Sequence, residues 1–214
     1  MLLTVVTFLP ALGALLVFFL PRGRPDLVKA TGFGVAAATF LASVPLYLRF
    51  DGANASYQFV EHRPWMPSLG IGYHLGIDGI SLLLVLLTTF LMPLTLLSAW
   101  HAIESRWKEF AITMLLLETG MVGVFAALDL FLFYVFWEAM LVPMYLIIGI
   151  WGGSNRVYAA IKFVLYTLTG SLLMLVAILA LYFQCGVRLG KFAGWRNNTS
   201  TLADGAEDSN SSRY

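Results

Sequence analysis

Six long apolar runs constrain what this chain can fold into. Each is close to the 17–25 residues that a helix needs to cross a bilayer, and none shows the ten-residue alternation of an outer-membrane β-barrel. Only 12% of the 214 residues are charged, whereas a soluble domain carries roughly 25%. We therefore predict an all-α, polytopic membrane protein with six transmembrane helices, at about 2–20, 28–48, 79–99, 110–128, 130–150 and 158–183.

The chain divides into a transmembrane region, residues 1–184, and a tail, residues 185–214. Between the second and third runs lies a long loop, 49–78, rich in Gly and Pro, so we expect a turn-rich cap there rather than another helix. Asp78, directly before the third run, is expected to cap free N–H groups of that helix. The tail is polar, small and without periodicity, which predicts disorder.

The basic residues of the short loops favour one orientation in the membrane. If the N-terminus lies outside, the outer loop 49–78 holds only Arg49 and Arg63. Cytoplasmic loops of membrane proteins carry the excess of Lys and Arg. The inner loops then carry the larger set of cations: Arg22, Arg24, Lys29, Arg106, Lys108 and Arg156.

Composition and motifs exclude several classes of function. A net charge of +1 gives no basic patch for nucleic acid. The single cysteine, Cys185, excludes an internal disulfide and a self-contained iron–sulfur site. His62 and His74 lack further ligands nearby in the sequence, so we expect no metal site. Nucleotide-binding loops and nucleophile elbows are absent from the sequence, and we expect no catalytic residue in this chain.

Three ionisable residues fall inside the predicted spans: Glu118, Glu138 and Lys162. A charged group at such depth is costly and is by default a functional-site hypothesis. Glu138 lies near the middle of its span, and Pro143 follows five residues later. Because proline has no N–H to donate to the carbonyl of Ala139, the helix should be weakened beside Glu138. Tyr134, one turn earlier on the same face, could donate to the carboxylate.

These residues suggest a proton path, but each of them also has a simpler structural interpretation. Counted from the inner helix ends at 1.5 Å per residue, Glu138 lies roughly 18 Å deep, Glu118 roughly 12 Å and Lys162 roughly 6 Å. Lys162 could instead extend to the inner headgroups. Glu118 could be a protonated contact between helices, because Thr119, Gly120 and Gly123 allow close approach. For Glu138, the alternative to a role in proton transfer is a purely structural role. The small polar residues 167–171 are more typical of a packing face.

Three sequence blocks resemble one family. They are FYVFWEAMLVPMYLIIGIWGG at 133–153, LGIDGIS at 75–81 and NRVYAAIKFVLYTLTGSL at 155–172. They are similar to the antiporter-like subunit M of proton-pumping NADH:quinone oxidoreductase, respiratory complex I, which is subunit 4 in mitochondria. The resemblance covers about 1–184. The W-E-x-M-L-V-P-M-Y form favours subunit M over its sister subunits L and N and over multisubunit sodium/proton antiporters.

The resemblance implies a fold, a site and partners. The family fold has roughly fourteen helices with two inverted repeats. By resemblance, Glu138 matches a glutamate that pairs with a lysine of the seventh helix and opens a proton channel. Lys162 falls where many bacterial members carry a lysine, and Glu118 matches no family residue. NADH, FMN, iron–sulfur clusters and quinone are expected in partner subunits, with none in this chain. Subunits L and N and a bacterial inner membrane are the expected surroundings.

The chain stops after the sixth predicted span, so the lysine partner of Glu138 lies outside it. Three functions are therefore expected from the sequence. The first is a proton-translocating membrane-arm subunit of complex I, represented by its N-terminal part. The second is a subunit of a cation/proton antiporter without quinone chemistry. The third is a truncated, non-catalytic scaffold.

Overall fold

The computed structural model describes residues 1–185 except 22, 55, 67–70 and 104–105. The tail predicted to be disordered, 185–214, therefore lies outside the described part except for Cys185, which ends a helix. Two helices, α5 and α6, together form one span, Leu130–Trp151, so the described residues contain six candidate membrane spans, as predicted. The elements in order are α1 (Leu2–Phe19), α2 (Pro25–Leu48), β1 (Gln58–Met66), β2 (Ile71–Ile77), α3 (Gly79–Ala102), α4 (Trp107–Ala126), α5 (Leu130–Ala139), α6 (Leu141–Trp151) and α7 (Arg156–Cys185).

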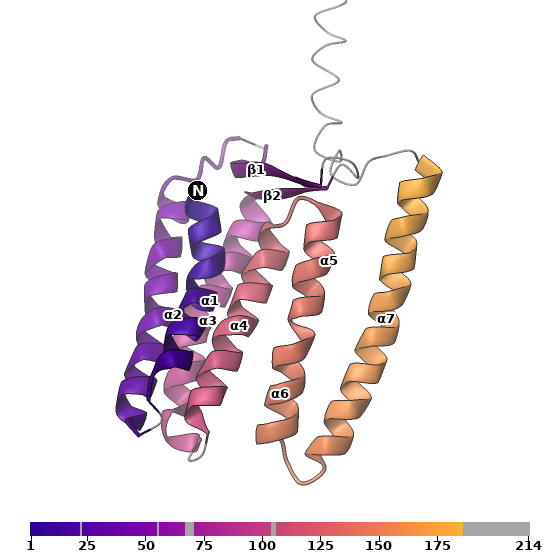
Figure 1. Cartoon of the computed structure of the whole chain (residues 1–214). Coiled ribbons are helices and arrows are strands. Elements are labelled where there is room, and N and C mark those ends of the chain that lie inside the picture. Colours follow the sequence, from indigo (N-terminus) through magenta and orange to yellow (C-terminus); the bar gives the residue numbers. More distant parts are fainter. Residues whose placement is uncertain (22, 55, 67–70, 104–105, 186–214) are drawn as a thin grey trace, which may run out of the picture.

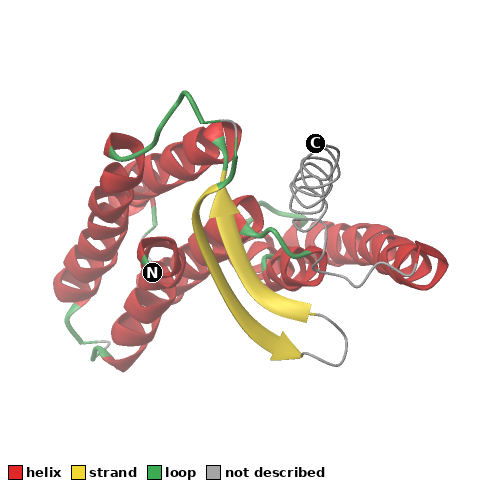
Figure 2. Cartoon of the chain, turned by 90° about the horizontal axis from the view of Figure 1, so that it is seen from above, coloured by secondary structure: helices red, strands yellow, loops and turns green. Residues whose placement is uncertain are grey.

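The helices form a bundle with an open edge (Figure 1). Helices α1 to α4 pack on one another, α5 packs on α4, and α7 contacts mainly α6. Seen from above, α7 lies at the far edge of the molecule from α2 and α3 (Figure 2). Most large side chains of α7 are exposed, with Tyr166 at 83%. In a membrane, surfaces of this kind face lipid or other membrane-embedded protein.

Two apolar clusters make up the core of α1–α4. One contains Val17, Val28, Leu96 and Trp107 and lies where α2 and α4 begin. The other contains Leu46, Leu75, Leu82 and Val122 and joins the helices to the hairpin of β1 and β2. Buried side chains are concentrated on α4, the helix that contacts α1, α2, α3, α5 and α6. Helix α4 is therefore the centre of the molecule.

The loop 49–78 contains an antiparallel hairpin, which the sequence-based expectation of a turn-rich cap did not include. His62 pairs with His74 and Arg63 with Tyr73, and the register shifts between Gln58 and Glu61. The segment before α5 adds a further hydrogen bond to β2: Leu128 N donates to His74 O at 2.9 Å. The sequence periodicity does not reveal these strands, because their register is irregular and β2 also bonds to Leu128, which is distant along the chain.

The start of α3 agrees with the sequence. Asp78 Oδ1 accepts a hydrogen bond from Ser81 N at 2.7 Å, which confirms the predicted cap. This bond lowers the pKa of Asp78, although partial burial acts in the opposite direction. Asp78 thus lies directly between the last residue of β2, Ile77, and the first residue of α3, Gly79.

A candidate proton-transfer site at the break in the fifth span

The fifth span is irregular at one residue, Met140, two positions after Glu138, where the backbone keeps right-handed helical dihedral angles (φ −72°, ψ −22°). Helix α5 ends at Ala139 and α6 begins at Leu141, with Met140 between them. Pro143 has no N–H to donate to the Ala139 carbonyl. The predicted weakening of the helix is therefore present, and Glu138 occupies the last turn of α5.

Two glycines of α4 allow this break to lie close against the bundle. A Cβ atom on Gly120 would lie 2.3 Å from Met140 Cγ, and one on Gly123 would lie 2.4 Å from Phe136 Cδ1. Any larger residue would push these side chains away, because real Cβ contacts are not so short. The expectation that Gly120 and Gly123 permit close helix approach is confirmed, and the helix that approaches is the one that carries Glu138.

The start of α5 is fixed by Asp129, a residue to which the sequence analysis assigned no role. Its Oδ1 accepts hydrogen bonds from Phe131 N at 2.8 Å and Leu132 N at 3.2 Å. Its Oδ2 accepts one from Gly72 N of β2 at 3.1 Å, and the residue is only 1% exposed. An Asp directly before an apolar run is a helix N-cap signal that could have identified it. Asp129 therefore ties α5 to the hairpin.

Glu138 is half-buried and faces α7 (Figure 1 shows the two helices side by side). It lines a pocket of about 440 Å³ together with Tyr145 and apolar residues of α6 and α7. Its Oε1 atom has no hydrogen-bond partner among the described residues, and neither has the buried Ser171 hydroxyl of α7. The Tyr134 hydroxyl lies near both groups. The site therefore holds a carboxyl group with a free acceptor atom.

Glu118 lies in a different environment, the interior of the α1–α4 bundle. It is 0% exposed, and neither carboxyl oxygen has a hydrogen-bond partner in the described part of the chain. Leu115 and Val122, on the same face of α4, belong to the two core clusters. A carboxyl group without a partner at such a position is costly unless it carries a proton or meets water.

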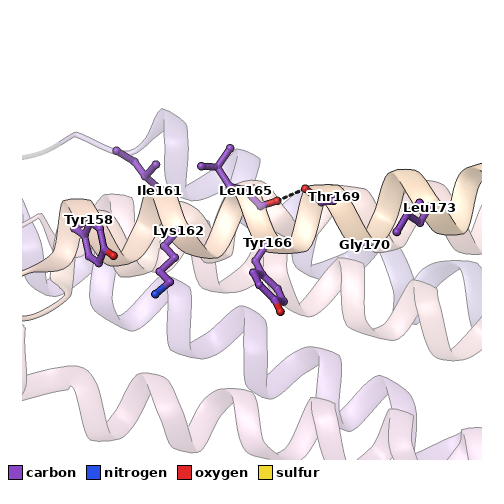
Figure 3. Close-up of a pocket in the computed structure, with 8 residues that line it drawn as sticks. All are labelled: Tyr158, Ile161, Lys162, Leu165, Tyr166, Thr169, Gly170 and Leu173. Carbon is purple, nitrogen blue, oxygen red and sulfur yellow. Dashed lines mark hydrogen bonds between the residues drawn. The ribbon is translucent and has the colours of Figure 1, made fainter.

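Lys162 lies on the exposed side of α7. Its ammonium group lies 5.7 Å from the centre of the Tyr158 ring. In Figure 3 its side chain points to the same side of α7 as Tyr158 and Tyr166, while Ile161 and Leu165 point away. Ile161 and Leu165 also line the pocket of Glu138, so Lys162 lies beside that pocket without entering it.

The structure does not bring the three predicted residues together. Among the described residues the only ion pair is between the N-terminal ammonium of Met1 and Glu61. Counted along each observed helix at 1.5 Å per residue, Glu138 is about 20 Å, Glu118 about 16 Å and Lys162 about 9 Å from the shared end of the spans. Glu118 and Glu138 are thus nearly level, rather than successive steps.

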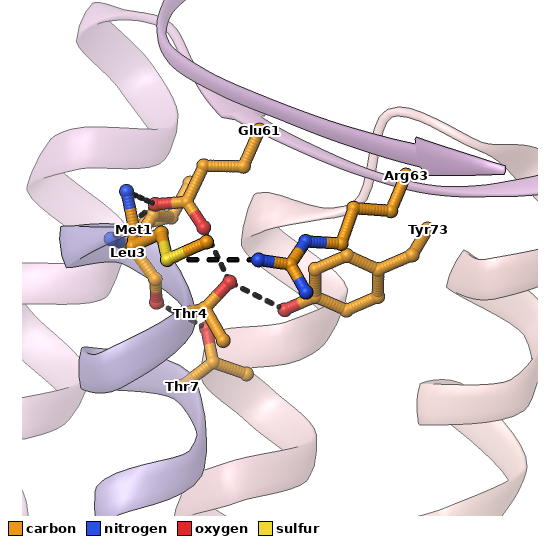
Figure 4. A network of polar contacts seen from close by, with 7 residues as sticks. All are labelled: Met1, Leu3, Thr4, Thr7, Glu61, Arg63 and Tyr73. Carbon is orange, nitrogen blue, oxygen red and sulfur yellow. Dashed lines mark hydrogen bonds and ion pairs between the residues drawn. The ribbon is translucent and has the colours of Figure 1, made fainter.

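A second polar network joins α1 to the hairpin (Figure 4). Glu61 accepts hydrogen bonds from Leu3 N at 3.0 Å and from the Thr4 hydroxyl, and Thr4 also contacts the Tyr73 hydroxyl at 2.9 Å. Burial raises the pKa of Glu61, but the ammonium of Met1 and these hydrogen bonds outweigh burial and lower the pKa overall. The network holds the N-terminal end of α1 against the strands and contains no residue of the predicted site.

Comparison with known proteins gives two matching family models. The model described as NADH-ubiquinone oxidoreductase chain 4, amino terminus, matches residues 38–123. The model described as NADH:quinone oxidoreductase/Mrp antiporter, transmembrane, matches residues 127–203. The first covers the hairpin and the helices around α4, and the second covers the span with Glu138.

Individual relatives agree with these models. The chain is 53% identical to NADH-quinone oxidoreductase subunit M of Rhodobacter capsulatus over 86% of this chain and 36% of that protein. It is 48% identical to NADH-ubiquinone oxidoreductase chain 4 of Arabidopsis thaliana over 83% of this chain and 36% of that protein. The chain thus spans little more than a third of these relatives.

Solved structures show the same fold. A chain of respiratory complex I from Thermus thermophilus matches with a TM-score of 0.75 and 34% identity, over 87% of this chain and 37% of that one. A chain of the Mrp complex from Dietzia matches with a TM-score of 0.70 and 19% identity, over 88% and 20%. The second likeness concerns the fold alone. The chain therefore belongs to the family of NADH-quinone oxidoreductase subunit M and NADH-ubiquinone oxidoreductase chain 4, of which it represents an N-terminal portion.

Proposed function

We propose that this chain is part of a proton-translocating membrane-arm subunit of NADH:quinone oxidoreductase. Electron transfer from NADH to quinone takes place in other subunits, and this subunit moves protons in response. The observation that carries the proposal is Glu138: an ionisable group at a helix break inside a span, with one carboxyl oxygen free. Intramembrane carboxyl groups in such places are typical proton carriers of pumps and transporters.

The three ionisable residues of the spans take different roles in this proposal. Glu138 exchanges protons, because its pocket between α6 and α7 gives it access from one side. Glu118 is a second protonable group at nearly the same depth, sealed within α1–α4. Lys162 lies on the exposed side of α7, beside that pocket. There its ammonium group either takes part in proton transfer or contacts a helix of a partner subunit. Their separation means that water or further protein must connect them.

Partners and location follow from the same proposal. The chain itself binds no cofactor, and NADH, FMN, iron–sulfur clusters and quinone are held by partner subunits. The sister antiporter-like subunits L and N are its neighbours in a bacterial inner membrane. The N-terminus and the hairpin face outward, because Arg24, Lys29, Arg106, Lys108 and Arg156 lie at the opposite ends of the helices.

Substituting the central carboxyl group tests the function. In inverted membrane vesicles from cells that express this chain, we expect Glu138→Gln to reduce NADH-driven proton uptake at least tenfold, while the chain still inserts. Asp51→Asn is the matched control, since Asp51 is an exposed carboxylate in the turn before the hairpin. Undiminished proton uptake in Glu138→Gln would contradict the site. If deleting the whole chain abolished NADH-driven proton uptake while Glu138→Gln left it unchanged, the scaffold interpretation would be favoured.

A cation/proton antiporter subunit is the second candidate. The family model that covers Glu138 describes Mrp antiporters as well as the oxidoreductase. The two candidates differ in what drives proton movement. Sodium-driven proton exchange that persists without NADH would favour the antiporter, whereas proton uptake that requires NADH oxidation and stops with quinone-site inhibitors favours the oxidoreductase.

A further inference from the structure

A pocket between the starts of α2 and α4 collects basic side chains at one membrane surface. It measures about 550 Å³ and has three cations and two carboxylates in its wall, which leaves one net positive charge. Helices α2 and α4 both begin here, and neither Arg24 nor Arg106 caps its helix through its side chain. The partial positive charges of two helix N-termini therefore add to the potential. The lining residues are Pro25, Asp26, Val28, Lys29, Arg106, Trp107, Lys108 and Glu109.

Two of the cations are held in place by contacts with the protein. Lys29 Nζ donates to the Trp100 carbonyl at 2.8 Å and lies 5.6 Å and 5.9 Å from the ring centres of Trp100 and Trp107. Lys108 Nζ donates to the carbonyls of Phe18 and Leu20 at 2.8 and 2.7 Å. Because an ammonium group has three donors, these hydrogen bonds leave donors on both lysines for an anion.

Trp107 contributes an orphaned polar atom. It is 6% exposed, and its indole Nε1 has no hydrogen-bond partner among the residues that the structure describes. Leaving a buried N–H without an acceptor costs free energy. Because this atom has almost no accessible surface, the N–H does not face open pocket space, and the cations are the groups available to a ligand there.

A second, largely apolar groove lies on the neighbouring stretch of α2 and the last turns of α3. It measures about 440 Å³ and is lined by Phe33, Leu97, Trp100 and His101. Phe33 follows Lys29 by one turn on the same face of α2, and Trp100 contacts Lys29 directly. Tryptophan rings are typical of the headgroup level of a bilayer. The charged pocket and the apolar groove are thus neighbours, joined by the contact between Lys29 and Trp100, although they share no lining residue.

We propose that this pocket binds the phosphodiester headgroup of an anionic phospholipid, with one acyl chain in the groove between α2 and α3. The net charge of the pocket matches a single phosphodiester anion, and basic pockets between transmembrane helices bind anionic headgroups in this manner. Free inorganic phosphate gains nothing from the groove, so the lipid is the ligand. The site lies on helices that do not carry Glu138, and it is independent of the proposed function.

Native mass spectrometry of the full chain in detergent tests the site. The chain is titrated separately with dioleoyl phosphatidylglycerol, dioleoyl phosphatidylcholine and inorganic phosphate. We expect one phosphatidylglycerol to be retained per chain at concentrations where phosphatidylcholine is lost, with no competition from phosphate. Equal retention of the two lipids would overturn the proposal. Displacement by phosphate at millimolar concentration would also overturn it, since that result would indicate a site for free anions.

Variants locate the bound lipid. Arg106→Gln and Lys29→Gln each remove one cation, and each should weaken phosphatidylglycerol binding about fivefold. Arg156→Gln is the control, because Arg156 begins α7 at the same membrane surface and donates only to a nearby carbonyl, Ile150 O. If Arg156→Gln weakened phosphatidylglycerol binding as much as Arg106→Gln does, the loss would come from general surface charge. That result would refute the site. Circular dichroism verifies that each variant is folded.

Discussion

Single side chains hold the candidate site in position, and Asp129 is the strongest example. It accepts three backbone hydrogen bonds from two elements and is almost fully buried. We expect Asp129→Ala to lower the free energy of unfolding by about 2–4 kcal/mol, because three buried N–H groups lose their acceptor. Asp78→Ala removes one cap at a more exposed position and should cost only about 1 kcal/mol. Unfolding of the purified variants by sodium dodecyl sulfate measures both values; equal losses would contradict this account.

His74 makes the hairpin sensitive to pH. Burial lowers the pKa of His74, the charge of His62 lowers it further, and Asp129 opposes both effects. In the unfolded chain the pKa returns to about 6.5. The unfolded state therefore takes up more protons as the pH falls below this value, so the hairpin is fully stable above about pH 6.5 and loses stability toward the lowered pKa of folded His74.

Hydrogen exchange of the β2 amides measures this dependence. After correction for intrinsic exchange rates, protection should be lower at about pH 5 than at about pH 7.5. His74→Gln should remove the difference, and His62→Gln should reduce it, because the two rings lie edge to face with centres 5.1 Å apart. An unchanged difference in His74→Gln would show that another group is responsible.

The sequence identified residues whose chemistry conflicts with their surroundings, but not those that need a tertiary partner. Glu138 and Glu118 stand out because a carboxyl group is rare within apolar runs. Ser171 does not stand out, because a hydroxyl within a small polar run is typical of helix packing, and its proximity to Tyr134 depends on how α5 meets α7. Asp129 is visible as a cap signal, whereas its bond to Gly72 is a property of the fold alone.

At the scale of elements, the contact between α4 and α5 decides where Glu138 lies. A Cβ atom at Gly123 would meet the Phe136 ring, whereas one at Gly34 of α2 would meet nothing within 4 Å. We expect Gly123→Ala to destabilise the protein by about 1–3 kcal/mol through overpacking. Gly34→Ala should be neutral or stabilising by up to about 1 kcal/mol, since alanine favours helix. Equal effects in an unfolding titration would mean that α5 does not pack on α4 as described.

Elements also differ in how well the sequence predicts them. The six spans follow from length and hydropathy alone, because a bilayer requires about 20 apolar residues in each. The irregularity between α5 and α6 follows from Pro143, which cannot donate to the Ala139 carbonyl next to Glu138. The hairpin does not follow, because its strands have a shifted register and β2 takes hydrogen bonds from the segment before α5. Only the assembled fold supplies that second partner.

At the scale of the whole molecule, charge is divided between the two membrane surfaces. Arg24, Lys29, Arg106, Lys108 and Arg156 lie at the ends of the helices opposite the hairpin, which carries Arg63. Since cytoplasmic surfaces of membrane proteins carry the excess of Lys and Arg, the hairpin should face outward. An even number of spans then places Met1 and the end of α7 on the hairpin side as well.

Cysteine labelling measures this orientation directly. Cys185 is the only cysteine in the sequence. The variant Cys185→Ser therefore provides a cysteine-free background, in which the labelling of one introduced cysteine shows on which side of the membrane that position lies. Ser56→Cys, before β1, should react with a membrane-impermeant maleimide in intact cells, because Ser56 belongs to the hairpin side. Ser154→Cys, in the exposed turn between α6 and α7, should react only after the cells are permeabilised. The reverse pattern would place the lipid pocket in the outer leaflet and the hairpin in the cytoplasm, and it would contradict the assignment of the basic helix ends to the inner surface.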